Sequence, residues 1–454
     1  MNAVGIIVFT IIAIALLMVP RRFAPLPLLA GCCYITMGQG IELGPLSLHA
    51  YRMLLLVGLA RVLMKGEKMD GDPSPIDKLI KIWAGWLVFA SLFHEFLPGS
   101  GPVFTIGVVM NIVLIYWFSR IWSSDLPSIM SVVASIAFVL APIALEMAYE
   151  KIAGRNLFGI FGGEGAVFIR DGEIRARGPF RHPILAGTVG ATCFPLMIGI
   201  WQKHRVPAIV GIIACITIVI ASRSSGPVVS FGVGAGMVAA WRYRHLAGRM
   251  AWLSVIGYFV IELLSNRPAY HVVVTRLDFT GSSTAHYRCR VIDVAIENFS
   301  EWAIFGTDHT RHWIPGGIGS VVGDGRHMDI TNYYVAMGVM GGFICMMLVI
   351  AMMFKAIKGV VDFANDEESG HSLENKFMVW CFGAALFSHA VSAISIAYFD
   401  QSQTFFWMTL AVTASVTLIR VDEEVAENET EQDTGVDRVV FPSNVSAQTN
   451  LGQR

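Results

Sequence analysis

The chain has 454 residues, of which 54% are apolar and only 15% are charged, and its mean hydropathy is +0.59. Soluble domains carry about 25% charged residues. The composition therefore predicts a membrane protein with several spans, and it excludes a disordered chain, a disulfide scaffold and a nucleic-acid-binding protein that relies on a basic surface. The formal net charge is −1.

Thirteen apolar stretches approach the roughly 20 residues that a membrane-spanning helix needs. We therefore expect an all-α polytopic membrane protein with about 12–14 transmembrane helices. The first stretch has no positively charged segment before it and no small-residue cleavage site after it, which predicts a retained span and not a cleaved signal peptide. The stretches are centred on 3–19, 24–38, 48–64, 80–97, 102–119, 127–147, 183–201, 206–221, 226–241, 250–264, 329–354, 377–398 and 402–419.

The basic residues predict an orientation, because they favour the cytoplasmic ends of spans. If Arg21 and Arg22 lie inside and the spans alternate, eight of the nine lysines face the cytoplasm and only Lys151 lies outside. Lys and Arg do not occur in the short outer connections 39–47, 98–101 and 399–401. We therefore expect the N-terminus outside and the C-terminus in the cytoplasm.

The spans and loops divide the chain into six parts. Both long outer loops exceed the roughly 12–15 residues above which a loop is usually functional or disordered. In the second loop, Tyr287, Val291, Ile292, Ala295 and Ile296 recur at helical spacing, which predicts a surface helix over the membrane mouth. The end of the chain has eight acidic residues against two arginines, which predicts a disordered tail. The parts are the N-terminal helices 1–147, the first outer loop 148–182, the central helices 183–264, the large outer loop 265–328, the C-terminal helices 329–420 and the acidic cytoplasmic tail 421–454.

Arginine is the dominant basic residue of the predicted outer face. Outside the tail the chain carries a net charge of +5, and twelve of its 24 arginines lie on the outer side. A guanidinium binds phosphate oxygens through two parallel hydrogen bonds and stays charged in a poorly hydrated pocket. For any single arginine, pairing with lipid headgroups or acidic residues explains it equally well. For the cluster as a whole we predict a diphosphate or another anionic ligand.

Four outer segments concentrate these residues. In the first, Arg175, Arg177 and Arg181 flank a Gly-Pro turn just before the span that begins near Pro183. This places them at the membrane surface beside a helix N-terminus, where a phosphate is stabilised. The other three segments are the turn 222–227 with Arg223, the start of the amphipathic helix with Arg288, and the stretch 325–334 with His327, Asp329 and Asn332.

In this order, the four segments resemble the O-antigen ligase and polymerase family, bacterial inner-membrane proteins that handle polysaccharide on undecaprenyl diphosphate. The family's first pattern is an Arg, then Gly-x-Phe and a Pro before a helix, and here it is matched by Arg175, Gly178, Phe180 and Pro183. The family's Ser-Arg-Gly-like turn and the Arg that opens its large periplasmic loop are matched by Ser222-Arg223 and Arg288. The resemblance covers roughly residues 150–360.

The family's His-Asn pair is matched only in part. Asn332 stands at the Asn position, but Thr331 occupies the His position. His327 and Asp329 lie four and two residues upstream of Thr331. Exopolysaccharide-associated members of the family look similar here, so the resemblance favours extracellular polysaccharide polymerisation or ligation over transfer to the lipopolysaccharide core.

The resemblance implies inverting glycosyl transfer from a lipid-diphosphate donor at the periplasmic face, without metal, nucleotide or other cofactor. Arginines would stabilise the leaving diphosphate, and a general base would take the proton of the attacking sugar hydroxyl. Diphosphate binding is assigned to Arg175, Arg177, Arg223 and Arg288. The catalytic candidates are Asp329 as the preferred base, His327 as the second choice, and Asn332.

The same resemblance implies the partners and the location of the protein. The donor would be an undecaprenyl-diphosphate-linked oligosaccharide, and the acceptor a polysaccharide or a lipid. Membrane lipids and other polysaccharide assembly or export proteins are further expected partners, and nucleic acid is not. The location would be the bacterial inner membrane, with a periplasmic N-terminus and a cytoplasmic C-terminus.

Two alternatives remain open at this point. A polytopic transporter or flippase of a lipid-linked or anionic solute would carry charged residues near the membrane midplane. Most charged residues here lie toward span ends. His389 is the exception, and a buried hydrogen bond between helices is its simplest explanation.

His309 and His312 could lie on one face of a helix as metal ligands, but no third ligand is fixed by spacing, so we expect no metal.

Overall fold

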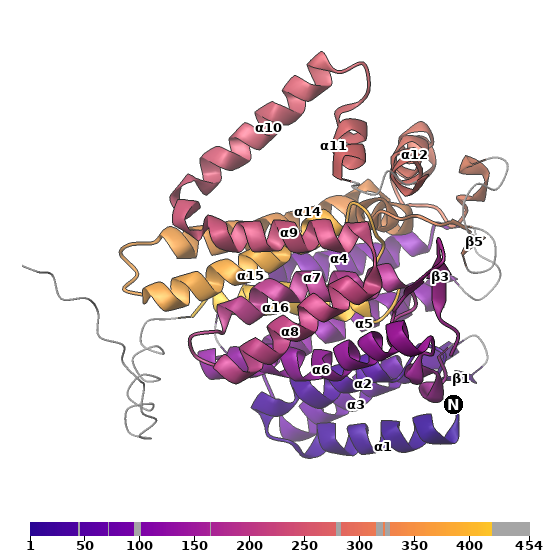
Figure 1. Ribbon diagram of the computed structural model, residues 1–454, viewed down its shortest axis with the longest axis vertical. Helices are drawn as coiled ribbons and strands as arrows, with labels where there is room; N and C mark the ends of the chain where they lie inside the picture. Colours follow the sequence, from indigo (N-terminus) through magenta and orange to yellow (C-terminus); the bar gives the residue numbers. More distant parts are fainter. Residues whose placement is uncertain are drawn as a thin grey trace, which may run out of the picture.

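The protein is seen in a computed structural model that describes residues 1–43, 46–70, 72–94, 101–163, 165–277, 283–314, 321–322 and 327–419. Of the described residues, 74% are helical, which confirms the expected helical class. Short antiparallel hairpins supplement the helices, and Figure 1 shows β1, β3 and β5 at the same end of the bundle as the N-terminus. The tail predicted over 421–454 lies outside the described residues.

The first third of the chain alternates helices with short connections. Its elements are α1 (Ala3–Met18), η1 (Arg21–Phe23), α2 (Pro25–Tyr34), β1 (Gly40–Leu43), β2 (Leu46–His49), α3 (Ala50–Lys65), α4 (Pro75–Ser91), α5 (Gly101–Ile121) and α6 (Leu126–Ala153). Local sequence explains several helix starts. Ser74 and Asp77 form a capping box with Pro75 at the first position of α4, and the Asp125 side chain caps α6.

The remaining long helices follow, and all of them except α10 pack against one another or against this part. They are α7 (Pro183–Gly199), α8 (Arg205–Ser222), α9 (Ser225–Ala239), η3 (Ala240–Leu246), α10 (Ala247–Leu264), α14 (Tyr333–Asn365), α15 (Leu373–Ser392) and α16 (Ser402–Val416). Glycines let α7 approach its neighbours closely, since a Cβ on Gly190 would lie 2.9 Å from the Cys215 carbonyl oxygen of α8. This packing fixes α8 and α9 against the start of α7.

The two predicted outer loops contain structure of their own. The first holds η2 (Leu157–Phe161), β3 (Phe168–Arg170) and β4 (Glu173–Arg175); the second holds α11 (Ala269–Leu277), α12 (Ser283–Glu297), α13 (Phe299–Trp302), η4 (Arg311–Trp313), β5 (Val321–Val322) and β6 (His327–Met328). The expected amphipathic helix is confirmed as α12. Its buried face contains Val291, Val294 and Ala295, whereas Ile296 is exposed, because this face packs against the start of α14.

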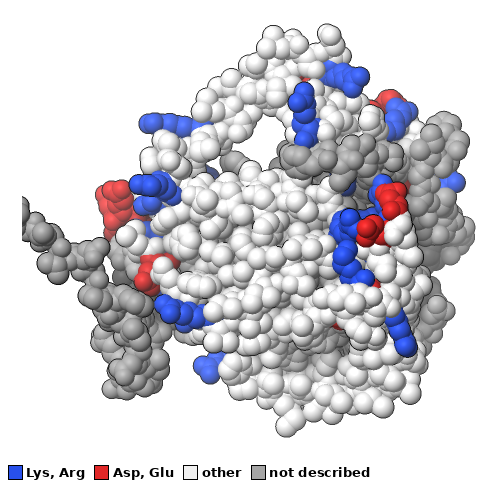
Figure 2. All heavy atoms as spheres, viewed as in Figure 1, with Lys and Arg blue, Asp and Glu red and all other residues white. Residues whose placement is uncertain are grey.

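Within the described residues, five helical stretches are long and apolar enough to cross a membrane: α5, α6, α8, the run from α9 through α10, and α14. The expected count was thirteen. Some of those stretches form shorter helices, such as α2 with 10 residues and α1 with 16. Figure 2 shows a broad uncharged band on one face of the molecule, between charged residues at its two ends.

Helix α10 has an unusual environment. It has 18 residues and none of them is buried. Its exposed side chains include Trp252, Phe259 and Leu263. Figure 1 shows that it extends away from the rest of the bundle. An apolar helix with this much open surface requires apolar surroundings to be stable.

The span expected over 329–354 is not one continuous helix. Gly341 and Gly342 have non-helical backbone angles, and Gly342 has a φ of 79°. The freed backbone groups are bonded from elsewhere: Trp86 Nε1 donates to the Gly341 carbonyl at 2.7 Å, and the Phe343 N–H donates to the Ala303 carbonyl at 2.9 Å. The break is tolerated because these partners replace the helical hydrogen bonds.

His389 is buried and hydrogen-bonded, as expected, but its partner does not lie on a neighbouring helix. The side chain is fully buried, and its Nδ1 lies 2.8 Å from the hydroxyl of Tyr398. Tyr398 belongs to the connection between α15 and α16 and not to a neighbouring helix.

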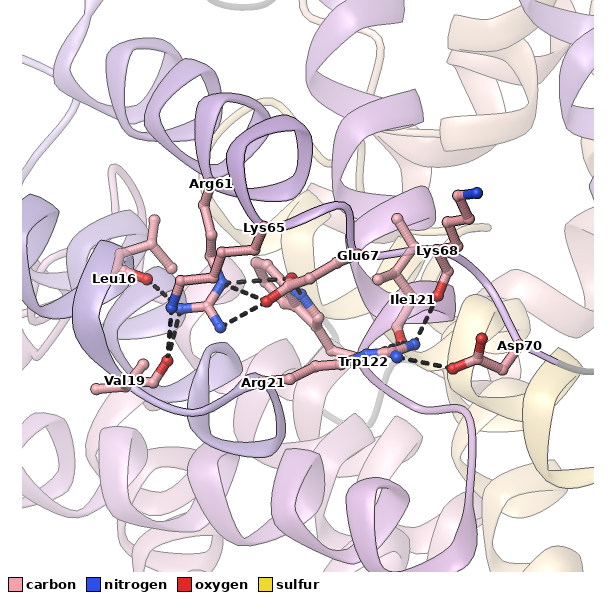
Figure 3. Close-up of polar contacts among 10 residues, drawn as sticks. All are labelled: Leu16, Val19, Arg21, Arg61, Lys65, Glu67, Lys68, Asp70, Ile121 and Trp122. Atoms are coloured by element: carbon pink, nitrogen blue, oxygen red, sulfur yellow. Dashed lines mark hydrogen bonds and ion pairs between the residues drawn. The ribbon is translucent and has the colours of Figure 1, made fainter.

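A buried arginine joins the ends of α1, α3 and α5 (Figure 3). Arg61 has no exposed surface, although an arginine near the end of an apolar helix usually extends its charged group toward water. Its guanidinium donates to the carbonyls of Leu16 and Val19 at the end of α1, and lies 2.8 Å from Glu67 Oε1. Trp122 Nε1 donates to the other Glu67 oxygen at 2.7 Å. Arg61 thus satisfies carbonyls that a helix leaves unpaired at its C-terminus.

Loss of Arg61 should destabilise the protein strongly. Arg61→Ala leaves the Glu67 carboxylate and the α1 carbonyls buried without their partner, at an expected cost of about 3–5 kcal/mol. The free energy of unfolding in detergent measures this effect. Lys358→Ala is the control, because Lys358 and Asp362 form an exposed pair whose loss should cost under about 0.5 kcal/mol. Equal stability of the two variants would contradict the role given to Arg61.

Candidate functional site

The first arginine segment begins in the β3–β4 hairpin. Asp171 and Gly172 form its turn with φ values of 54° and 76°, a region that favours glycine and tolerates aspartate. Ile169 pairs with Ile174, and the strand ends on Arg175. The Ala176 N–H then donates to the Ala221 carbonyl at 3.1 Å, which fixes this strand end to the last turn of α8.

A buried carboxylate holds the turn that follows. Glu150 of α6 has no exposed surface. Its Oε2 accepts the N–H groups of Arg177 at 3.0 Å and Gly178 at 2.9 Å, and the side-chain amide of Asn156 at 3.1 Å. Gly178 has a φ of 55°, and a Cβ there would lie 3.1 Å from Met147, so both the backbone angle and the space favour glycine.

The connection between α15 and α16 holds the other side of the same turn. Asp400 is fully buried, and its Oδ2 accepts the Arg181 N–H at 2.9 Å. Gln401 Nε2 donates to the Pro179 carbonyl at 2.7 Å. Burial raises the pKa of Asp400 above its usual value. The main chain from Arg177 to Arg181 is therefore bonded on both sides by side chains from distant parts of the sequence.

Arg175 points from this frame toward the start of α9. Its side chain is buried, with Nη2 2.5 Å from Ser224 Oγ and Nε 3.4 Å from the Ser222 carbonyl oxygen. Burial lowers the pKa of Arg175 below its usual value. Arginine nevertheless stays charged in proteins. The hydrogen-bond partners are neutral oxygens, so no hydrogen-bonded carboxylate cancels the charge.

Arg288 of α12 reaches the same place. A Cβ on Gly226, in the first turn of α9, would lie 3.7 Å from Arg288 Nη2 and 3.4 Å from Ser395 Oγ. Ser224 precedes α9 but does not cap it, because its hydroxyl donates to the Ser222 carbonyl and accepts from Arg175. The positive end of a helix dipole thus lies beside two buried arginines, an arrangement that attracts an anion.

The other two predicted arginines have local contacts. Arg177 is buried, and it donates to the carbonyls of Arg181 at 3.3 Å and Ala166 at 3.1 Å. Arg223 ends α8 in a left-handed conformation, with a φ of 44°, and is half exposed. It forms an ion pair with Glu173 and lowers the pKa of that carboxyl. Their predicted role in diphosphate binding stays a prediction.

His182 is a site residue that the sequence analysis missed. It precedes Pro183, and its Nδ1 accepts the Ile184 N–H at 3.1 Å, so it caps α7. Burial, together with the charges of Arg175, Arg177 and Arg170, lowers its pKa to about 4. The signal in the sequence was a histidine directly before the proline that opens a helix.

The segment with the proposed base adjoins α12. The Tyr287 hydroxyl, one residue before Arg288, donates to the Asp329 carbonyl oxygen at 2.7 Å. Burial and the charge of Asp329 raise the pKa of Tyr287 to about 12. His327 Nδ1 lies 3.3 Å from Thr310 Oγ1. Asp329 is therefore carried by backbone that is bonded to the helix of Arg288.

Asn332 has contacts that position the start of α14. Its Oδ1 accepts the Val335 N–H at 3.1 Å, and its Nδ2 donates to the Ile394 carbonyl at 3.2 Å. Ser395, the next residue, lies beside Gly226 of α9. Asn332 thus connects α14 to the segment that lies beside Gly226 at the start of α9, and its predicted catalytic role stays a prediction.

The low pKa of His182 predicts a pH-dependent stability. The group is neutral in the folded state above about pH 4 and takes up a proton in the unfolded state below about 6.5. Stability is therefore lost as the pH falls, by roughly 2 kcal/mol between pH 7.5 and pH 5. His182→Asn keeps a cap acceptor and removes this dependence. The free energy of unfolding of the wild type and of His182→Asn, measured at pH 7.5 and at pH 5, tests this prediction. An equal loss of stability in the two proteins would contradict the low pKa of His182.

A scan against protein-family models and a search of curated proteins both find no match for this chain. The candidate site is defined by its geometry: two buried arginines and a helix N-terminus, with Asp329 and His327 on the adjoining segment. Such a site suits a ligand with several negative charges, next to a group that can accept a proton.

Proposed function

We propose that the chain is an integral membrane glycosyltransferase of the O-antigen ligase and polymerase type. It would polymerise or ligate lipid-diphosphate-linked oligosaccharide at the periplasmic face of a bacterial inner membrane, in cell-surface polysaccharide synthesis. The observation that carries the proposal is that two buried arginines approach the start of α9, Arg175 at Ser224 and Arg288 beside Gly226. They come from two separate motifs of the resemblance, and the turn 222–227 with Ser222-Arg223 holds a third.

The apolar surface supports a membrane location. In the part of the chain that the structure describes, five helical stretches have the length and composition of spans, and α10 has no buried residue. A helix that is apolar and open on all sides suits lipid and not water. The hairpin β3–β4 and the helices α11 and α12 lie toward the same end of the bundle in Figure 1, which suits a site at one membrane surface.

The proposed reaction needs no covalent enzyme intermediate. The acceptor hydroxyl oxygen attacks the anomeric carbon of the donor sugar, and the bond from this carbon to the diphosphate oxygen breaks. The diphosphate leaves with the electron pair, and Arg175 and Arg288 stabilise the charge that develops on it. The hydroxyl proton passes to Asp329, or to His327, as the general base.

Purified protein in detergent tests the function directly. Given an undecaprenyl-diphosphate oligosaccharide and a glycan acceptor, it should yield longer or transferred glycan, and transport has no meaning without a sealed membrane. Gel electrophoresis and mass spectrometry detect the product. No product under these conditions, together with movement of the lipid-linked substrate across sealed vesicles, would instead support a flippase.

Arg288 and Arg290 form a matched pair for testing the anion site. Both lie on α12, but Arg290 is exposed and pairs with Glu297 at 2.8 Å. Arg288→Ala and Arg175→Ala should each lower turnover by about a hundredfold or more, as expected when a donor to the developing charge is removed. Arg290→Ala should stay within about threefold. Similar activity of the Arg288 and Arg290 variants at similar stability would refute the assignment.

The general base has its own test. Asp329→Asn should lower turnover by about a hundredfold, because the amide cannot take the hydroxyl proton, while donor binding stays unchanged. His327→Gln should have the smaller effect. Single-turnover assays with saturating donor separate the two steps, and the reverse order of effects would move the base to His327.

A further inference from the structure

Two histidines of the large outer loop lie close together outside the proposed glycosyl-transfer site. His309 and His312 are both exposed, and their Nδ1 atoms are 3.2 Å apart. The two rings are nearly parallel, at 11°, with centroids separated by 5.0 Å. No step of the proposed reaction uses either ring.

Glu301 of α13 fixes the orientation of one of these rings. Both of its carboxylate oxygens lie 3.0 Å from His312 Nε2, and the indole N–H of Trp313 donates to Oε2 at 2.8 Å. A carboxylate acceptor keeps the proton on Nε2. The lone pair of His312 is then on Nδ1, where it accepts a hydrogen bond from His309 Nδ1 in this structure. A metal ion bound by both nitrogens would take the place of that proton.

The spacing of the two Nδ1 atoms matches the bite of a metal ion. Nitrogen ligands about 2.0–2.1 Å from one ion, at tetrahedral or octahedral angles, lie roughly 2.9–3.4 Å apart. A histidine that binds a metal usually donates its other N–H to a carboxylate, as His312 does to Glu301. We propose that His309 and His312 form a two-histidine site for a divalent transition-metal ion of the zinc class, with Glu301 orienting His312.

The proposed ion would keep water in its other positions. Among the residues that the structure describes, no group of three or more His, Cys, Asp or Glu side chains is arranged to hold a metal. Two imidazoles with water make a weaker site than a closed structural zinc site, and one open to exchange with solvent. The expectation from spacing was that no metal binds, because no third protein ligand is fixed, and the zinc titration below decides between the two.

The position of the pair suggests what the ion would do. Thr310, between the two histidines, contacts His327 Nδ1 at 3.3 Å and accepts the Met328 N–H at 3.1 Å. An ion that joins His309 to His312 would fix this segment against the strand that leads to Asp329. The metal site itself does not depend on the proposed glycosyltransferase activity.

Zinc binding by the untagged, full-length protein in detergent tests the proposal. Isothermal titration at pH 7.5 should show one saturable Zn²⁺ per chain. His309→Ala and His312→Ala should each weaken binding by at least about tenfold, and Glu301→Gln by about 10–100-fold. His286→Ala is the matched control, since His286 is an exposed histidine of the same loop, and it should bind as the wild type does.

Two results would overturn the proposal. One is the lack of saturable zinc binding to the wild type. The other is equal affinity in the wild type and in the His309→Ala/His312→Ala double variant, which would place the ion elsewhere. The His309 and His312 variants replace exposed side chains. A thermal unfolding curve in the absence of zinc tests whether these variants are folded.

Discussion

Buried carboxylates that accept main-chain N–H groups determine the shape of the turn from Arg177 to Arg181. Glu150 binds the N–H groups of Arg177 and Gly178, and Asp400 binds that of Arg181. Burying a carboxylate costs free energy unless the group is hydrogen-bonded. The backbone of the turn must therefore keep the conformation in which its N–H groups point at Glu150 and Asp400. Since α6 and the α15–α16 connection supply the two acids, the turn joins distant parts of the chain and leads directly into α7.

The constraint on the backbone leaves the arginine side chains with different charge environments. Arg223 is neutralised by Glu173 at the surface, whereas the hydrogen bonds of Arg175 go to Ser224 and Ser222. Arg288 lies near the first turn of the same helix, α9. Two guanidinium groups together with the positive end of a helix dipole favour the binding of a multivalent anion. This is the physical reason to regard Arg175 and Arg288 as the ligand-binding pair.

Sequence periodicity and local motifs predicted much of the fold but little of the tertiary detail. The helical class and the amphipathic helix α12 follow from local pattern, and the structure confirms both. The hydrogen bond expected for His389 is present, but its partner lies in a connection and not on another helix. Burial of Arg61 and the roles of Glu150 and Asp400 depend on contacts between residues far apart in sequence. A hydropathy window likewise treats Gly341 and Gly342 as part of an apolar run, although the chain breaks the helix there. Among the described residues, helix length and apolar composition identify five candidate spans. Which helices cross the bilayer depends also on how they contact lipid, which a hydropathy window does not contain.

Native mass spectrometry of the purified protein can detect lipid binding at Arg175 and Arg288. Undecaprenyl diphosphate should bind one per chain and much more tightly than undecaprenyl monophosphate. The Arg175→Ala/Arg288→Ala double variant should lose this preference for the diphosphate, while Arg290→Ala keeps it. Equal retention of the two lipids by the wild type, or an unchanged preference in the double variant, would contradict a diphosphate site at the start of α9.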